Sequence, residues 1–138
     1  MFDTIDHSAW AGRLLSVLRI MTGLLFFSHS LVKLFGFPPG APPGQVPILG
    51  LYGAAGLIEF VGGALIILGL FTRPVAFLLS GQMAVAYFLV HAPQAFLPGL
   101  NGGEEAILFC FIFLFMSAAG AGPWSLDAVR RRSRAKAD

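Results

Sequence analysis

Residues 49–70, LGLYGAAGLIEFVGGALIILGL, contain one charged side chain, Glu59, among 22 positions. A helix rises about 1.5 Å per residue, so roughly 20 apolar residues cross the ~30 Å hydrocarbon core of a bilayer. The stretch therefore predicts a transmembrane helix. Glu59 would lie about ten residues, or roughly 15 Å, into that helix and hence near the middle of the membrane.

Three further apolar stretches also predict transmembrane helices. The chain is 57% hydrophobic and 12% charged, whereas a typical soluble domain has about twice that charged fraction. We therefore expect an all-α membrane protein with a four-helix transmembrane bundle in residues 13–122. A signal peptide is the competing interpretation of the first stretch, but that stretch is long, lacks an obvious cleavage site and retains Lys33 near its far end. The four predicted spans are residues 13–35, 49–70, 74–91 and 104–119.

Sequences rich in proline and glycine separate the predicted spans. FGFPPGAPPGQVP at residues 35–47 contains five prolines and three glycines, which predicts a loop. TRP at residues 72–74 predicts a tight turn, with Pro74 suited to the first position of a helix. HAPQAFLPGLNGG at residues 91–103 predicts the third connection, and GAGPW at residues 120–124 ends the last span.

The distribution of basic residues predicts the orientation of the chain. Five of the nine basic residues lie in the last nine positions, and Arg73 lies in the second connection. Because Lys and Arg collect on the cytoplasmic side of membranes, both termini are expected in the cytoplasm. Residues 1–12 would be a cytoplasmic segment and residues 123–138 a basic cytoplasmic tail. The chain has no pattern typical of a nucleic-acid-binding protein, so no nucleic acid is expected.

Glu59 is too deep in its predicted span to reach water by extending its side chain. It must therefore be protonated, paired, or next to an aqueous or ligand-filled cavity. Gln82 reaches a similar depth in the third span. Two interpretations stay open: a structural pair of Glu59 with Gln82 or with Arg19, and a carboxylate with a functional role. The nearby Gly56, Gly62 and Gly63 predict a small-residue seam for close helix packing.

The remaining polar residues of the first span lie nearer its ends. Arg19 and Lys33 could each extend a charged group to the nearer membrane surface. His29 lies one helical turn before Lys33. A single histidine in a helix is compatible with packing as well as with ligand binding.

The sequence NGGEE at residues 101–105 precedes the last span. Asn101 and Glu104 have the spacing of a capping box, which predicts the start of a helix. A capping box does not explain Gly102 and Gly103, since each glycine costs about 1 kcal/mol relative to alanine inside a helix. Their amides would let a ligand oxygen or another backbone come close. A quinone head group or small anion could bind there, because four charged or titratable residues are expected at similar height: His29, Lys33, His91 and Glu104.

Four segments, taken in order, resemble the DoxX family of small membrane proteins. They are RIMTGLLFFSHSLVKLFGF (19–37), EFVGGALIILGLFTRPVA (59–76), NGGEEAILFCFIFLF (101–115) and GAGPWSLD (120–127). The resemblance implies a multi-pass protein of a prokaryotic inner membrane. Some members are similar to a subunit of a thiosulfate:quinone oxidoreductase, and others are linked to complexes that handle thiol or oxidative stress. The positions of interest that it implies are Arg19, His29, Lys33, Glu59, Asn101, Gly102, Gly103 and Glu104.

The expected function is that of a membrane subunit of an oxidoreductase complex, with a quinone or small-ligand site and a docking surface for a partner. Glu59 would handle a proton, and Gln82 and His91 would join the ligand-binding residues. The sequence has no haem, flavin, iron–sulfur or metal-binding motif, and its single cysteine, Cys110, belongs to no redox motif. We therefore expect a quinone as ligand, no covalently bound cofactor, no metal, and electrons from a redox partner protein.

Two other functions stay open. The chain could be a non-enzymatic scaffold or carrier for another membrane protein, in which case its polar residues would be structural. It could also transport a small solute, although four spans would need an oligomer to enclose a path. Besides the lipid bilayer, an oligomer is expected in any case, and whether the chain itself has enzymatic activity is left undetermined.

Overall fold

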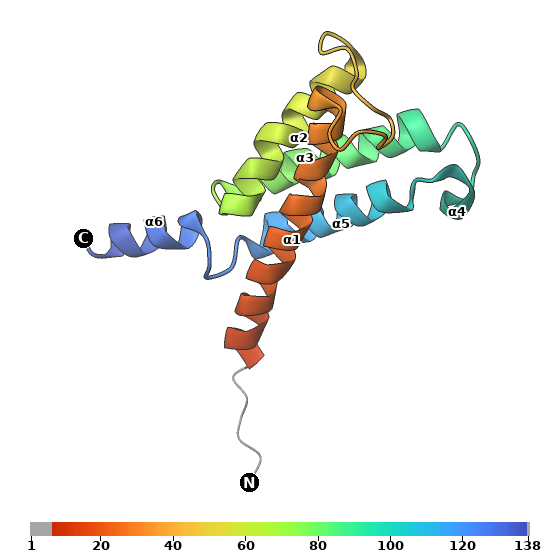
Figure 1. The fold of residues 1–138 in the computed structure, drawn as a ribbon. Coiled ribbons are helices and arrows are strands. Elements are labelled where there is room, and N and C mark those ends of the chain that lie inside the picture. Colours follow the sequence, from red (N-terminus) through yellow and green to blue (C-terminus); the bar gives the residue numbers. More distant parts are fainter. Residues whose placement is uncertain (1–6, 138) are drawn as a thin grey trace.

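The chain folds into helices joined by turns and loops, and the computed structural model describes residues 7–137 (Figure 1). Those residues contain no strand. Residues 1–6 of the predicted N-terminal segment and residue 138 of the predicted tail lie outside the described residues. In chain order the elements are α1 (His7–Phe35), α2 (Leu51–Leu68), α3 (Thr72–Ala86), the π-helical turn η1 (Tyr87–His91), α4 (Pro98–Asn101), α5 (Glu104–Ala119) and α6 (Leu126–Ala135).

Three stretches of helix are long and apolar enough to cross a membrane: Ser8–Phe35, Leu51–Leu68 and Thr72–His91. The prediction of an all-helical protein with apolar spans is therefore confirmed for the described residues. The α5 helix is also apolar, but it comprises 16 residues. Part of the predicted tail forms α6, a helix that the sequence patterns did not predict.

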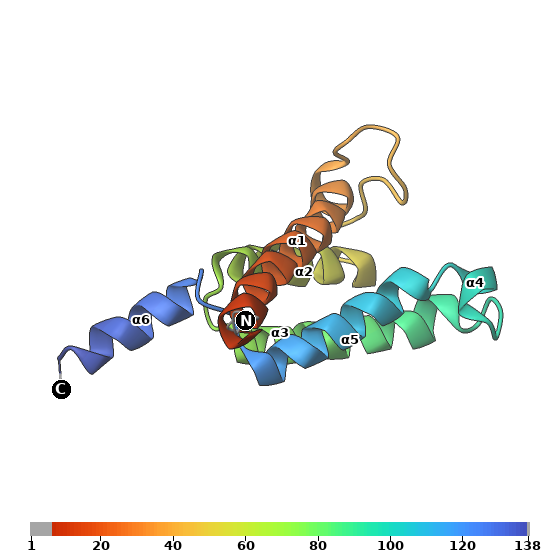
Figure 2. The ribbon, with the colours of Figure 1, turned by 90° about the horizontal axis from the view of Figure 1, so that it is seen from below.

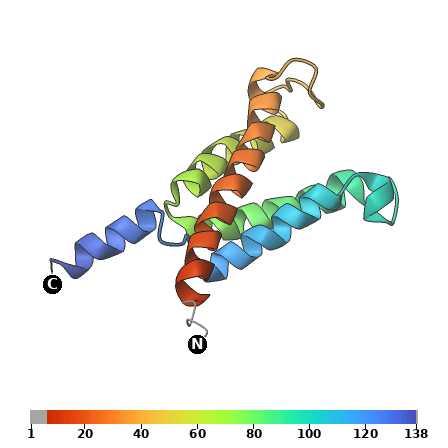
Figure 3. The ribbon, with the colours of Figure 1, turned by 60° about the horizontal axis from the view of Figure 1, so that its bottom comes forward.

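The four longest apolar helices form two hairpins. In one, α1 lies beside α2; in the other, α3 lies beside α5 (Figures 1 and 2). The hairpins diverge from the turn between α2 and α3, so that the loop at residues 36–50 and the connection at residues 92–103 lie apart (Figure 3). α1 also crosses α5, which joins the two hairpins.

Glycines allow α2 to approach its neighbours closely. A Cβ atom on Gly63 would lie 3.1 Å from the Cα of Phe27 in α1, and one on Gly56 would lie 3.2 Å from the Cβ of Lys33. Gly62 faces α3 instead, where an added Cβ would lie 2.8 Å from Leu79. The predicted small-residue seam is thus confirmed, and it serves two different helix contacts.

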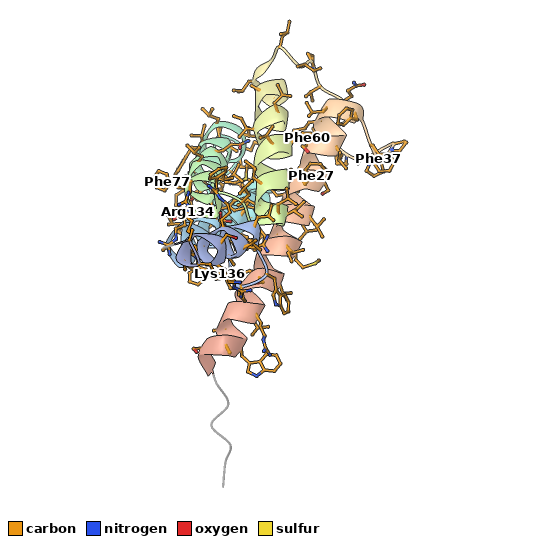
Figure 4. All side chains as sticks on the ribbon, turned by 90° about the vertical axis from the view of Figure 1, so that its left-hand side faces the viewer. Phe27, Phe37, Phe60, Phe77, Arg134 and Lys136 are labelled. Atoms are coloured by element: carbon orange, nitrogen blue, oxygen red, sulfur yellow. The ribbon has the colours of Figure 1, made fainter. Side chains whose placement is uncertain are left out.

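An aromatic cluster fills the crossing of α1 over α5. The ring of Phe26, which is 1% exposed, meets the rings of Phe109 and Phe113 edge-on, with centroids 5.3 and 4.9 Å away. Burying an aromatic side chain of this size and pairing it edge-on both favour the folded state. On the other side of α1, the ring of Phe27 packs at 4.9 Å against that of Phe60 in α2 (Figure 4).

Candidate functional site

Lys33 and Glu59 form an ion pair between α1 and α2. The Lys33 Nζ atom lies 2.6 Å from Glu59 Oε1, and the two side chains are 16% and 3% exposed. Both residues belong to stretches that are long and apolar enough to cross a membrane. A lysine and a glutamate at such positions compensate each other's charge, where either alone would be costly.

Gln82 of α3 completes this polar group, which we call the Lys33–Glu59–Gln82 site. Its Nε2 atom donates to Glu59 Oε1 and to the carbonyl of Ala55, both at 3.3 Å. Two buried acceptors in the site, Glu59 Oε2 and Gln82 Oε1, have no hydrogen-bond partner within the described part of the chain. The site therefore combines one ammonium donor with two unused acceptors, which is a suitable set for a ligand that both accepts and donates hydrogen bonds.

The direction of the helices explains why Lys33 reaches Glu59. Side chains on a helix tilt toward its N-terminus. Lys33 near the end of α1 therefore tilts back along α1, and Glu59 in the antiparallel α2 tilts toward the same level. From the sequence alone, the two residues are expected at different depths, with Gln82 or Arg19 as the partner of Glu59. Applying the tilt to two adjacent antiparallel spans would have identified Lys33.

A second polar group links η1 to the connection before α5. His91 Nδ1 donates to the carbonyl of Asn101 at 3.0 Å, and the His91 ring stacks on that of Tyr87. Asn101 Nδ2 donates to Ala95 O at 2.9 Å and to the Tyr87 hydroxyl at 3.3 Å. Asn101 Oδ1 accepts from the Gly103 amide at 2.8 Å. These contacts fold the connection back on itself and onto η1.

The predicted capping box is wrong. Asn101 is the last residue of the short helix α4, and α5 begins at Glu104 with Gly103 at its N-cap and no side-chain cap. The physical reason is that Gly102, at φ 67°, turns the chain between the two helices, so Asn101 bonds within its own connection. The sequence predicts that the Gly103 amide is available to a ligand oxygen. In the structure this amide donates to Asn101 Oδ1 instead.

Gly103→Ala is expected to destabilise the protein by about 1–3 kcal/mol, the usual cost of overpacking. The added Cβ would lie 2.6 Å from the ring of Tyr87 and 2.7 Å from Asn101 Oδ1, so these side chains would have to move. Thermal unfolding in detergent measures the change. Gly81→Ala in α3 is the control, because no atom lies within 4 Å of the added methyl group, and helix propensity should leave it neutral or up to about 1 kcal/mol more stable. A Gly103→Ala protein as stable as wild type would show that Tyr87 is not tightly packed there.

His29 pairs with Glu105 at the crossing of α1 over α5. His29 Nε2 lies 3.3 Å from Glu105 Oε1, and the side chains are 39% and 64% exposed. The sequence analysis had singled out Glu104, which belongs to neither of the two ion pairs among residues 7–137. An exposed pair of this kind contributes little to stability, at most about 1 kcal/mol.

Arg19 lies apart from the other candidate residues, about 21 Å along α1 from Lys33 at 1.5 Å per residue. Its side chain is fully buried. The guanidinium donates to the carbonyls of Ile66 and Ile67 at the end of α2. It also donates to the carbonyls of Ala121 and Trp124 in the segment before α6. Arg19 therefore does not pair with Glu59; its guanidinium holds α1, the end of α2 and the segment before α6 together.

The structure thus divides the ten candidate residues among several places. It brings together Lys33, Glu59 and Gln82, and separately His91, Asn101 and Gly103, with Gly102 in the turn beside the second group. His29 faces Glu105, Glu104 belongs to no described ion pair, and Arg19 is buried at the opposite end of α1 from Lys33.

Comparisons with known proteins agree on the kind of protein. The sequence model of the DoxX family matches residues 14–92. An uncharacterized protein of Haemophilus influenzae is 42% identical over 121 residues, which cover 82% of this chain and 87% of that protein. The uncharacterized membrane protein Rv3486 of Mycobacterium tuberculosis is 34% identical over 136 residues, covering 85% of this chain and 80% of that protein. No solved structure matches the chain.

Proposed function

This chain belongs to the DoxX family of membrane proteins, and on that premise we propose that it is the membrane subunit of an oxidoreductase complex. Its part would be to bind a quinone head group at the Lys33–Glu59–Gln82 site. The observation that supports this proposal is a buried ion pair between apolar spans with two acceptors left unused beside it. Ionisable groups inside membrane spans are costly and usually serve a function.

The chemistry of the site suits both redox forms of a quinone. The ammonium of Lys33 can donate to a quinone carbonyl, while Glu59 Oε2 and Gln82 Oε1 can accept from the hydroxyl groups of a quinol. Reduction of the quinone consumes two electrons and two protons. A redox partner protein would supply the electrons, and Glu59 would take up and pass on a proton.

A ligand could reach this site only if the helices part, because the Glu59 side chain is 3% exposed. For an apolar quinone, that route would start in the lipid. The enclosure of the pair is also the observation that favours a second candidate function, a scaffold for another membrane protein. In a scaffold, Lys33, Glu59 and Gln82 would only hold α1, α2 and α3 together.

Binding of a short-chain ubiquinone to the purified protein in lipid nanodiscs tests the first function. We expect saturable binding, detected by equilibrium binding of a radiolabelled quinone, and a loss of at least about tenfold, or ~1.4 kcal/mol, in Gln82→Leu. Gln82 is suited to this test because only two long hydrogen bonds depend on it. Gln94→Leu, on the exposed connection after η1, is the matched control and should bind normally. Absence of saturable binding to the wild-type protein would reject the quinone site and leave the scaffold.

We further propose that α5 is the fourth span of a transmembrane bundle whose termini both lie in the cytoplasm. At about 1.5 Å per residue, its 16 residues extend roughly 24 Å, and α5 packs beside α3. Arg73 shares one cavity with three arginines of α6, and Arg13 shares another with Arg132, so these basic residues lie at one end of the molecule. The relatives are bacterial, and the membrane would be the prokaryotic inner membrane.

The orientation predicts which positions an impermeant maleimide can label in intact cells. In a Cys110→Ser background, cysteines at Gln45 and Gln94 should react from outside, because both loops would face away from the cytoplasm. A cysteine at Ser133 on α6 should react only after the cells are opened. Protection of position 45 or 94 in intact cells, with labelling after lysis, would contradict the proposed orientation.

A further inference from the structure

A cavity of about 250 Å³ lies between the first turn of α3, the end of α5 and helix α6. Four arginines line it, Arg73 from α3 and Arg130, Arg131 and Arg134 from α6, together with one acid, Asp127. We call it the arginine pocket. Its formal charge is plus three, which favours an anion as ligand.

Within residues 7–137, the pocket arginines outnumber the one carboxylate that lines the pocket, that of Asp127, by four to one. Arg130 lies over the ring of Phe71, 4.7 Å from the centroid. The two ion pairs among residues 7–137 are His29 with Glu105 and Lys33 with Glu59, and neither involves the pocket. Guanidinium groups in this situation bind phosphate oxygens well, because their paired N–H groups match the geometry of a phosphate.

Asp127 fixes the pocket rather than filling it. Its two carboxylate oxygens accept from the backbone amides of Phe71 and Thr72 at the start of α3, each at 2.9 Å. Burial raises the pKa of Asp127, but these hydrogen bonds and the charge of Arg131 outweigh burial and hold the pKa below its usual range. The carboxylate is therefore ionised at neutral pH and attaches the first turn of α6 to the first turn of α3.

The surroundings of the pocket indicate where its ligand comes from. Phe71 lies between the two candidate spans Leu51–Leu68 and Thr72–His91, which places the pocket at a boundary of the apolar region. α6 extends away from the hairpins beside that boundary (Figures 1 and 2). It presents Leu126 and Val129 as exposed apolar side chains, 41% and 55% exposed, three residues apart on one face. A helix with one basic and one apolar face lies in the headgroup layer of a membrane.

Two sets of basic residues can be distinguished on α6. Arg130 and Arg131 follow Asp127 by three and four residues, and Arg134 follows them by four and three, so the pocket residues share a face. Arg132 and Lys136 do not line the pocket. Figure 4 labels one residue of each set, Arg134 of the pocket and Lys136 outside it, near the C-terminal end of α6. The second set offers a control with the same charge on the same helix.

We propose that the arginine pocket binds the phosphate of an anionic phospholipid headgroup and so fixes α6 to the membrane surface. The arginines would hold the phosphate oxygens, and the exposed apolar side chains of α6 would lie among the upper parts of the acyl chains. The volume of the pocket suits a headgroup rather than a whole drug-sized molecule, for which cavities of about 300–1,000 Å³ are usual. The inference requires a membrane protein but is independent of the proposed quinone site.

The test is titration of the full-length protein, purified in a neutral detergent, with phosphatidylglycerol, phosphatidylcholine or inorganic phosphate, followed by native mass spectrometry. We expect one saturable molecule of phosphatidylglycerol and none of phosphatidylcholine at the same concentration. In Arg130→Gln/Arg134→Gln the affinity should fall at least about tenfold. In Arg132→Gln/Lys136→Gln, which removes the same charge, it should fall less than about threefold.

Three outcomes would overturn the proposal. Equal weakening in the two double variants would mean diffuse attraction to the basic helix rather than a site. Saturation by inorganic phosphate at the same concentration as by the lipid would mean that the ligand is free phosphate. Binding of phosphatidylcholine as tight as that of phosphatidylglycerol would mean that the charge is not recognised. Arg73→Gln, outside α6, keeps the test valid if the double variant does not fold.

Discussion

Replacing Arg19 with methionine is expected to destabilise the protein by at least about 4 kcal/mol, a large part of the 5–15 kcal/mol by which most domains are stable. Hydrogen bonds to a charged group contribute about 1.5–3 kcal/mol each. Arg19 makes four of them from a fully buried position, at 2.8 Å to Ala121, 2.6 Å to Ile66, and 2.5 Å to Ile67 and Trp124. Methionine fills a similar volume but leaves all four carbonyls without this donor.

The location of these carbonyls increases the expected effect. Ile66 and Ile67 belong to the last turn of α2, where unpaired carbonyls carry the negative end of the helix dipole. Ala121 and Trp124 belong to the segment that leads from α5 to α6. Losing Arg19 would therefore loosen α1, α2 and the attachment of α6 at the same time.

Yield, gel filtration and thermal unfolding in detergent measure the effect of Arg19→Met. Arg13→Met is the matched control on the same helix, because the guanidinium of Arg13 lies over the ring of Trp10, 5.5 Å from its centroid, at the half-exposed start of α1. It should cost less than about 1 kcal/mol. Arg19→Lys should be intermediate, since one ammonium cannot reach all four carbonyls in both segments. A monodisperse Arg19→Met protein that melts within a few degrees of wild type would show that the guanidinium does not hold the segments together.

Removing one partner of the Lys33–Glu59 pair is expected to cost about 3–5 kcal/mol, whereas removing both should restore most of the loss. In Glu59→Leu the ammonium of Lys33, 16% exposed, would lose its carboxylate between two apolar helices. In Lys33→Met the nearly buried carboxylate would lose its counter-ion and keep only the hydrogen bond from Gln82. In Lys33→Met/Glu59→Leu neither charge has to be desolvated, and apolar side chains of similar volume fill the space.

A double-mutant cycle on unfolding in detergent measures the coupling between the two residues. The exposed pair His29–Glu105 is the control, and Glu105→Gln should cost less than about 1 kcal/mol. A coupling below about 1 kcal/mol for Lys33 and Glu59 would mean that water screens the pair in the folded protein. Quinone binding to the Lys33→Met/Glu59→Leu variant distinguishes the two functions. If the pair is only structural, replacing both residues should leave quinone binding unchanged.

The helices could be predicted from sequence because their causes are local. An apolar run of transmembrane length, bounded by proline and glycine, favours a helix whatever it packs against. Local signals of the same kind mark α6. Ser125 is its N-cap and accepts from the amide of Ala128 at 3.1 Å, and Asp127 lies in its first turn. The basic charge of this segment predicts a cytoplasmic tail, but charge alone does not indicate this helix.

The capping box shows how a local pattern can mislead. Asn101 and Glu104 have the expected spacing, yet Asn101 bonds to Ala95, Tyr87 and the Gly103 amide within a folded connection. Spacing predicts which groups could bond along the chain. It does not include the competing partners that a neighbouring segment supplies.

The sequence by itself determined a helical membrane protein of the DoxX family, with its apolar spans, its turns and a set of ionisable residues that need partners. Only the tertiary structure decided the partners: Lys33 for Glu59, four backbone carbonyls for Arg19, Glu105 for His29, and a shared pocket for Arg73 and the arginines of α6. Apolarity and helix propensity act along the chain, so sequence reveals them. The partner of a buried charge depends on the rotation, tilt and crossing of helices that are distant in sequence, and these are set by packing contacts such as Gly63 on Phe27 and Phe26 on Phe113.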